Sequence, residues 1–176
     1  MAYGLRNPWK VSIDSKNRMF IGDCGWKTVE SVYLLNDLYS GLPYNLGWPV
    51  FEGTKRYKGD SLMFQDTLAP IYEYTDRPGC IIGGFYLDHL EVYLFGDLFG
   101  TLRLLKKQKN GKWYLSHSDK PVNIIWSFGY DEKTKKIFIG PNNFELKIFI
   151  LTKLESQAKL CRTTMPNGSI NNLGCQ

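Results

Sequence analysis

Two short clusters near the N-terminus carry the residue types that could bind a small polar ligand. The first is YGLRNPW (residues 3–9), and the second is GDCGW (residues 22–26). The guanidinium of Arg6 offers a planar fork of donors that suits a carboxylate, and the amide of Asn7 adds a donor and an acceptor. Because Gly25 has no side chain, the backbone can turn tightly there or approach another group closely. The clusters therefore predict polar groups presented at the rim of a strand.

Short apolar segments separated by turn residues predict the elements that would position these clusters. Aromatic residues make up 15% of the chain, and they favour pleated, half-buried strands. Only residues 151–160 show a trace of helical spacing. About a dozen closely spaced strands indicate an all-β sandwich, barrel or propeller. The predicted strands are residues 10–13, 18–22, 28–35, 71–74, 81–86, 92–97, 101–106, 112–117, 124–130, 136–139 and 146–151.

The two clusters resemble the glucose/sorbosone dehydrogenase family of soluble quinoproteins, and most closely its hedgehog-interacting protein branch. The resemblance spans residues 3–150 and implies a β-propeller with four strands per blade. The predicted fold class is therefore an all-β partial β-propeller of about three four-stranded blades. The further segments that match, in the family's order, are NLGWP (45–49), APIYEY (69–74), GGFY (83–86), LFGD (94–97) and SFGYD (127–131).

The predicted domain organisation is a half propeller at residues 1–154 and a polar tail at residues 155–176. Most of the tail is rich in Asn, Ser, Thr and Gly, which predicts that it is disordered or becomes ordered on a partner. The matching segments all belong to the C-terminal part of the family's domain. We therefore expect the N-terminal part, which supplies the family's catalytic histidine, to come from another chain or to be lost.

The resemblance implies a cofactor site at the two clusters. It places Arg6 and Asn7 against the cofactor pyrroloquinoline quinone and its sugar substrate. It also places the backbone carbonyls of Gly25 and Trp26 on the cofactor's calcium ion, since calcium takes six to eight oxygen ligands and carbonyls serve well. In such a site the cofactor supplies the redox chemistry, and the protein supplies position and charge.

The resemblance further implies a structural calcium ion, held by the side chain of Glu30 and the carbonyl of Leu46. One or two carboxylates make a weak calcium site. The alternative for Glu30 is that it accepts hydrogen bonds from loop amides or pairs with a lysine. The alternative for Arg6 is an ion pair with a carboxylate such as Asp23 or Asp97.

Several cations that the family uses around its cofactor have no counterpart in this sequence. The segment DLFG (97–100) contains no lysine, and PVN (121–123) contains no arginine. A tricarboxylate without these cations would be a buried anion without partners, which is costly. We therefore assign no catalytic residue, do not expect pyrroloquinoline quinone to bind, leave calcium open, and regard the four cofactor-binding positions as vestigial.

These departures favour a function without catalysis. The expected function is that of a truncated propeller acting as a structural or interaction subunit of a larger assembly, such as a virion or shell. One alternative is a binding module like the hedgehog-interacting proteins, and another is half of a dehydrogenase for aldoses that depends on pyrroloquinoline quinone. Because uncapped blade edges invite pairing, we expect self-association or a protein partner.

The charge of the chain is modest, at a formal +5. Two lysine runs, KKQK (106–109) and KTKK (133–136), lie beside turn residues and are interpreted as solvated hairpin tips, with an anionic surface as the alternative. Nucleic acid is not expected as a partner. We interpret the five tryptophans as blade-core packing; they are Trp9, Trp26, Trp48, Trp113 and Trp126.

The four cysteines are Cys24, Cys80, Cys161 and Cys175. They lack the spacing of zinc ligands and are interpreted as free thiols in a reducing compartment. Pairing of Cys161 with Cys175 and glycosylation of Asn167 stay open. The chain shows no apolar signal-peptide core near its start and no apolar run long enough for a membrane span, so the expected location is the cytoplasm or a particle assembled there.

Overall fold

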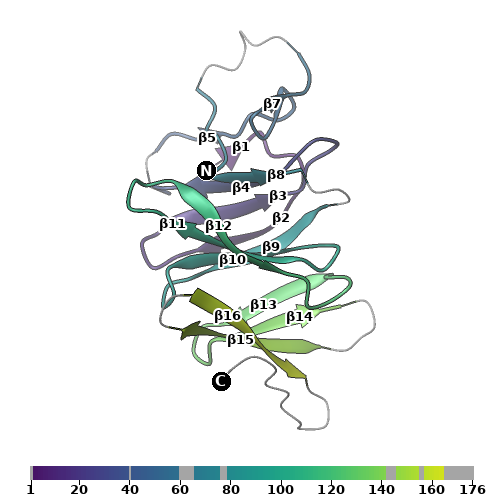
Figure 1. Cartoon of the computed structure of the whole chain (residues 1–176). Coiled ribbons are helices and arrows are strands. Elements are labelled where there is room, and N and C mark those ends of the chain that lie inside the picture. Colours follow the sequence, from purple (N-terminus) through teal and green to yellow (C-terminus); the bar gives the residue numbers. More distant parts are fainter. Residues whose placement is uncertain are drawn as a thin grey trace.

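The computed structural model is built from three four-stranded antiparallel sheets and two small two-stranded sheets (Figure 1). It describes residues 2–39, 41–59, 66–75, 79–141, 146–154 and 157–164, with the backbone alone from 151 onward. Within these ranges no helix forms, and so none could cross a membrane. The strands are β1 (Ala2–Tyr3), β2 (Pro8–Ile13), β3 (Met19–Asp23), β4 (Glu30–Leu35), β5 (Tyr44–Asn45), β6 (Phe51–Glu52), β7 (Lys55–Arg56), β8 (Tyr72–Tyr74), β9 (Ile81–Leu87), β10 (Val92–Asp97), β11 (Leu102–Lys107), β12 (Trp113–Asp119), β13 (Ser127–Asp131), β14 (Lys136–Gly140), β15 (Lys147–Leu154) and β16 (Gln157–Thr164).

The three large sheets follow one another along the chain as blades. Blade 1 has the order β2-β3-β4-β8, blade 2 comprises β9 to β12, and blade 3 comprises β13 to β16. Figure 1 shows them as successive layers. The first strands meet, because β2 lies against β9 and β9 lies against β13. This arrangement confirms the prediction of a partial all-β propeller with four-stranded blades.

The hairpin between β2 and β3 illustrates how polar residues end the strands. One carboxylate oxygen of Asp14 accepts hydrogen bonds from the backbone amides of Lys16 (3.0 Å) and Arg18 (2.9 Å). Asn17 adopts a φ of 57°, a left-handed conformation that asparagine tolerates better than most residues. The second oxygen of Asp14 pairs with the guanidinium of Arg18 at 2.6 Å, so the turn also fixes the direction of that side chain.

Two apolar clusters join neighbouring blades. Between blades 1 and 2, Phe20 is fully buried and stacks on Tyr93 with 4.8 Å between ring centroids. Fully burying a side chain of this size stabilises the fold by about 1.5–3 kcal/mol. The buried members between blades 1 and 2 are Phe20, Val32, Leu34, Tyr74, Ile81, Tyr93, Phe95 and Leu105; those joining blades 2 and 3 include Leu94, Leu104, Ile125, Phe128, Ile137 and Phe149.

Gly83 lies where the first strands of the three blades approach one another. A Cβ atom added there would stand 3.2 Å from both the Cδ of Lys10 in β2 and the Cβ of Phe128 in β13. The amino group of Lys10 donates a hydrogen bond to the carbonyl of Phe128. A larger residue at position 83 would therefore push β2 and β13 away from β9, which gives this glycine a structural reason.

The side of blade 1 that faces away from blade 2 is covered only in part. Over β3 and β4, the buried Ile21, Tyr33 and Leu35 pack against Leu46 and the N-terminal segment. Parallel pairing of β1 with β5 holds this cover together. Over β2 there is no such cover within the described residues, because Trp9, Val11 and Ile13 are 50%, 47% and 56% exposed. We call these three residues the β2 row.

The C-terminal boundary differs from the prediction. The sequence placed the end of the propeller at residue 154 and a trace of helix at residues 151–160. In the structure, β16 pairs antiparallel with β15 from Leu154 opposite Gln157 to Lys147 opposite Thr164. The outward backbone groups of β15 need hydrogen-bond partners, and β16 supplies them. The predicted tail beyond residue 164, with Asn167 and Cys175, lies outside the described residues.

The interpretation of all five tryptophans as core residues is wrong for three of them. Trp9, Trp26 and Trp126 are about half exposed, at 50%, 50% and 54%. Trp48 and Trp113 are partly buried, and Trp48 stacks on Tyr57. The exposed three lie on the free side of β2 or in loops, where no neighbouring blade within the described residues covers them.

Candidate functional site

The two N-terminal clusters meet at one end of blade 1, around the carboxylate of Asp23. Asp23 closes β3 and accepts hydrogen bonds from the backbone amides of Arg6 (3.0 Å) and Asn7 (2.7 Å). The amide of Cys24 returns a bond to the carbonyl of Asn7 at 3.2 Å. Burial raises the pKa of Asp23, and the bonds from Arg6 and Asn7 oppose that rise only in part. Asp23 thus holds the segment that leads into β2, and its carboxylate is not presented to solvent.

The guanidinium of Arg6 is committed to the neighbouring loop. It donates to the carbonyls of Cys24 (3.1 Å) and Gly25 (2.8 Å). Its carbon atom lies 4.6 Å from the ring centroid of Trp26, a cation–π contact. The expected ion pair of Arg6 with Asp23 or Asp97 is absent among the described residues, since the bond to Asp23 comes from the backbone and Asp97 pairs with Arg103.

Glu52 of β6 organises the loop between β3 and β4. Its Oε1 accepts hydrogen bonds from the backbone amides of four successive residues, from Trp26 (2.7 Å) to Val29 (3.2 Å). Its Oε2 accepts from the hydroxyl of Thr28 at 2.7 Å. Burial alone would raise the pKa of Glu52, but the hydrogen bonds from Thr28, Lys27 and Val29 outweigh it and lower the pKa below its usual range.

Glu30 ties the same loop to blade 2. Its side chain is fully buried, and its Oε2 accepts hydrogen bonds from the amides of Gly25 (3.2 Å) and Ile81 (3.1 Å). Beside it, a disulfide joins Cys24 to Cys80 across the junction of blades 1 and 2, with 4.8 Å between their Cα atoms. The expectation of free thiols is therefore wrong for this pair. Their separation of 56 positions hides the pairing from the sequence.

The structure brings Arg6, Asn7, Gly25 and Trp26 together, but it does not add Leu46 to Glu30. The carbonyl of Leu46 accepts the hydroxyl of Tyr33 at 3.2 Å, on the free side of blade 1. Glu30 faces the opposite side of β4, where its carboxylate bonds to Ile81 of blade 2. Glu30 and Tyr33 are three residues apart on β4, so their side chains point to opposite faces of the sheet. Leu46 contacts Tyr33 on one face, and the carboxylate of Glu30 lies on the other, so the two proposed calcium ligands are separated by the sheet.

The residues present do not fit the family's cofactor and its calcium ion. The carbonyl of Gly25, which the resemblance places on calcium, already accepts the Arg6 guanidinium at 2.8 Å. A divalent cation at this oxygen would be repelled by that guanidinium. The side chain of Arg103, a buried cation of blade 2, pairs with Asp97. Asp97 also accepts hydrogen bonds from the backbone amides of Phe99 and Thr101, so it stabilises the turn between β10 and β11.

Solved structures with the same fold support the propeller architecture. The pyrroloquinoline-quinone-bound aldose sugar dehydrogenase from Streptomyces coelicolor superposes with a TM-score of 0.60 at 17% identity, covering 81% of this chain and 39% of that protein. Sqt1 from Saccharomyces cerevisiae gives 0.55 at 8% identity, covering 91% and 36%. This chain is a segment of a β-propeller.

A putative oxidoreductase (glucose dehydrogenase) from Thermus thermophilus has a TM-score of 0.50 at 15% identity, with 85% of this chain and 39% of that protein covered. The propeller segment thus spans about two-fifths of the length of these structures. At such identities the likeness shows the fold alone. A comparison with models of known protein families gives no match.

Sequence reasoning missed Glu52, which holds the loop of this site in place. Glu52 lies 23 to 26 positions from the amides that it binds, in a segment where the sequence predicted no strand. A glutamate two residues beyond Val50 and just before Gly53 carries no signal that would single it out. The glycine at position 25 did point to the close approach, because a Cβ there would stand 2.7 Å from Oε1 of Glu52 and 1.8 Å from the carbonyl oxygen of Val29.

Proposed function

We propose that this propeller segment is a non-catalytic structural or interaction subunit, and that it binds its partner through the free side of blade 1. The observation that carries the proposal is the β2 row. Trp9, Val11 and Ile13 alternate along β2 and are each about half exposed. On the other face of the same strand, Lys10 and Ser12 bond to residues of blades 3 and 2.

The β2 row differs from the neighbouring strands in its exposure to solvent. On β3 and β4, the apolar side chains of the same side are buried under the chain's own N-terminal segment and loop. The row continues that apolar surface toward the line where first strands meet. Exposed apolar side chains that adjoin a core are typical of interaction surfaces, and tryptophan is enriched among the residues that dominate binding energy.

The energy of the row sets the size of the contact. Burying the exposed half of each of the three side chains gives about 1 kcal/mol apiece. A micromolar complex needs about 8 kcal/mol after the costs of association. The β2 row therefore forms the centre of a larger interface, which also takes in the half-exposed Tyr3. An interface of roughly 1,000 Å² or more is expected.

A second copy of this chain is the partner that we propose. Two sets of three blades would make a ring of six, and a twofold axis closes such an assembly without leaving a free blade. In that arrangement blade 1 of each copy meets blade 3 of the other. Sqt1 and the two sugar-dehydrogenase-like structures are longer chains that contain this fold as about two-fifths of their length. Further blades beside these three are therefore compatible with the fold.

Catalysis is not proposed, because the groups that would have to hold a quinone cofactor are engaged elsewhere. Arg6 bonds to two loop carbonyls and stacks on Trp26. The supply of a sugar, calcium and pyrroloquinoline quinone to the purified chain should give no reduction of a dye acceptor above a denatured control. No specific observation favours a binding module of the hedgehog-interacting type.

Native mass measurement of the purified chain tests the proposal. A single chain has a mass of 20.3 kDa, and the expected species is twice that mass at micromolar concentration. Trp9→Ser should shift the population toward the single chain. Tyr114→Ser is the matched control, because Tyr114 is an exposed aromatic residue of β12 in blade 2, and the proposed contact joins blades 1 and 3. Equal effects of both substitutions, or a wild-type chain that stays single, would overturn the proposal.

A further inference from the structure

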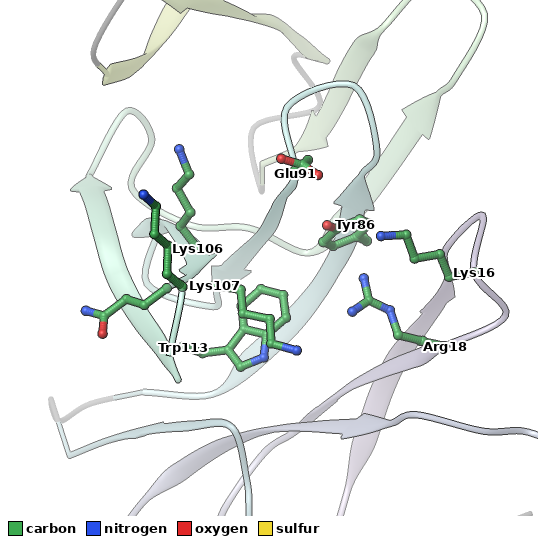
Figure 2. A pocket seen from close by; sticks show the side chains of 9 residues that line it. Lys16, Arg18, Tyr86, Glu91, Lys106, Lys107 and Trp113 are labelled. Carbon is green, nitrogen blue, oxygen red and sulfur yellow. The ribbon is translucent and has the colours of Figure 1, made fainter. Parts of the chain in front are cut away.

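A cavity of about 290 Å³ lies at the opposite end of the blades from Arg6, between blades 1 and 2. Its walls come from the β2–β3, β9–β10 and β11–β12 hairpins. Figure 2 shows Lys16 and Arg18 entering from the β2–β3 hairpin on one side, and Lys106 and Lys107 entering from β11 on the other. The volume is close to the lower end of the range for small-molecule sites, which is roughly 300 Å³.

The lining is strongly cationic. Five of the lining side chains are Lys16, Arg18, Lys106, Lys107 and Lys109, and the single carboxylate among them is Glu91. Arg18 is paired with Asp14. The four lysines form no ion pair with any carboxylate in the described part of the chain. Several like charges held around one concavity raise its positive potential and attract an anion.

The cavity also has an aromatic wall. Trp113 of β12 and Tyr86 of β9 line it between the two groups of cations (Figure 2). Both side chains are partly buried, and Phe20 fixes their positions, stacking on Tyr86 at 4.9 Å and meeting Trp113 edge-on at 5.5 Å. An aromatic surface that is held in place and partly exposed suits the flat ring or apolar body of a ligand.

The second lysine run of the chain differs in its surroundings. Lys133 and Lys135 lie in the β13–β14 turn beside Asp131 and Glu132. Asp131 accepts the backbone amide of Lys133 at 3.0 Å. That run therefore mixes both signs of charge, and its lysines are not among the residues that line the cavity. The first run, interpreted from the sequence as a solvated hairpin tip, is the one that the fold places opposite the cations of another blade.

We propose that this cavity binds a small phosphorylated ligand with a planar ring, such as a nucleotide. The phosphate groups lie between Lys16 on one side and Lys106 and Lys107 on the other. The ring lies toward Trp113 and Tyr86. Lysine ammonium groups bind phosphate as point charges, so the site recognises the charge and the ring rather than one stereochemistry. The site is independent of the β2 row and of the proposed assembly.

Calorimetric titration of the full chain at low ionic strength tests this site with three probes: adenosine diphosphate, pyrophosphate and adenosine. Adenosine diphosphate should bind at least about tenfold more tightly than pyrophosphate or adenosine, because only adenosine diphosphate contacts both the lysines and the aromatic wall. Its affinity should fall on addition of salt, since the lysines are exposed. Absence of heat with adenosine diphosphate at millimolar concentration would overturn the proposal.

Two double variants separate this cavity from general surface charge. Lys106→Gln with Lys107→Gln should weaken binding of adenosine diphosphate by about tenfold or more. Lys133→Gln with Lys135→Gln removes the same charge from the other run and should leave the affinity within about twofold. Equal weakening by the two variants would contradict the site. So would a single-stranded oligonucleotide that binds more than about tenfold tighter than adenosine diphosphate, which would indicate a nucleic-acid surface instead.

Discussion

The two sides of blade 1 both carry alternating apolar side chains, but one side is buried against blade 2 and the other is partly exposed to solvent. Toward blade 2, β3 and β4 present Phe20, Val32 and Leu34, all buried in a closed apolar cluster. Away from blade 2, β2 presents Trp9, Val11 and Ile13 with the same alternation, and these are half exposed. An alternating pattern thus predicts that a strand has an apolar side. It does not predict which segment, if any, covers that side.

The largest expected effect is the difference in unfolding free energy between a substitution on the side of blade 1 that faces blade 2, which we call the closed side, and one on its free side, the open side. Phe20→Ala removes a fully buried ring that stacks on Tyr86 and Tyr93, and it should lower the free energy of unfolding by about 3–5 kcal/mol. Val11→Ala, on the open side, should change it by less than about 0.5 kcal/mol in the single chain. Denaturant unfolding monitored at several protein concentrations measures both. A loss at Val11 as large as that at Phe20 would mean that the β2 row is buried.

The disulfide gives the next largest effect, because it lies on the closed side at the junction of the blades. Cys24 and Cys80 are 56 positions apart, and a bond across such a loop restricts the unfolded chain. Cys80→Ser should therefore cost about 2–4 kcal/mol of stability. A reducing agent should lower the melting temperature of the wild-type chain and leave that of the variant unchanged. An unchanged wild-type melting temperature, with reduction verified by thiol titration, contradicts the pairing.

Glu52 tests how the loop between β3 and β4 is held. Glu52→Gln keeps the size of the side chain but loses the charge that five donors share, and it should cost about 1–3 kcal/mol at neutral pH. Glu132→Gln, an exposed glutamate in a turn, serves as the control and should be neutral. Equal costs for the two substitutions would show that the hydrogen bonds around Glu52 carry no special weight.

The pH dependence of that difference has a defined sign. The pKa of Glu52 is lowered in the folded chain, so the folded state binds its proton less readily than the unfolded state does. The stabilisation is fully present above the unfolded-state pKa, about 4.3, and is lost as the pH falls through the lower folded-state value. The gap between wild type and Glu52→Gln should be constant above about pH 5 and shrink on acidification. A gap that widens in acid would contradict the role given to this carboxylate.

Local patterns were enough to predict most of the strands. Most predicted strands lie within a few residues of those observed, because each is a short apolar segment between turn residues such as Asp14 and Asn17. The choice of a propeller came from the resemblance to the glucose/sorbosone dehydrogenase family, whose segments follow one another in the same order. The strand β16 was missed because its polar residues read as tail, while its pairing depends on the free edge of β15, which no local signal describes.

The site could be predicted only where its residues are close in sequence or share a motif. Arg6, Asn7, Gly25 and Trp26 do come together, as the two clusters suggested. Long-range partners were beyond reach. The bonds of Glu52 and the pairing of Cys24 with Cys80 depend on how β6 and β9 pack against blade 1, and neither leaves a trace in spacing.

The smallest effect on stability belongs to the β2 row, and its effect on assembly is the largest. Trp9→Ser should leave the melting temperature of the single chain nearly unchanged, since half of the ring is already in water. The same substitution should weaken association by about tenfold or more, because tryptophans near the centre of an interface contribute most to binding. A melting temperature that falls steeply with no change in association would place Trp9 in the core instead.

The most direct test of the account is the mass of the native chain across a dilution series. The free side of blade 1 predicts a species of twice 20.3 kDa that dissociates on dilution. Trp9→Ser should move the midpoint to higher concentration, and Tyr114→Ser in blade 2 should leave it in place. A chain that remains single from low to high micromolar concentration, with Trp9 still accessible to a fluorescence quencher, would contradict the claim that the β2 row pairs with a second copy.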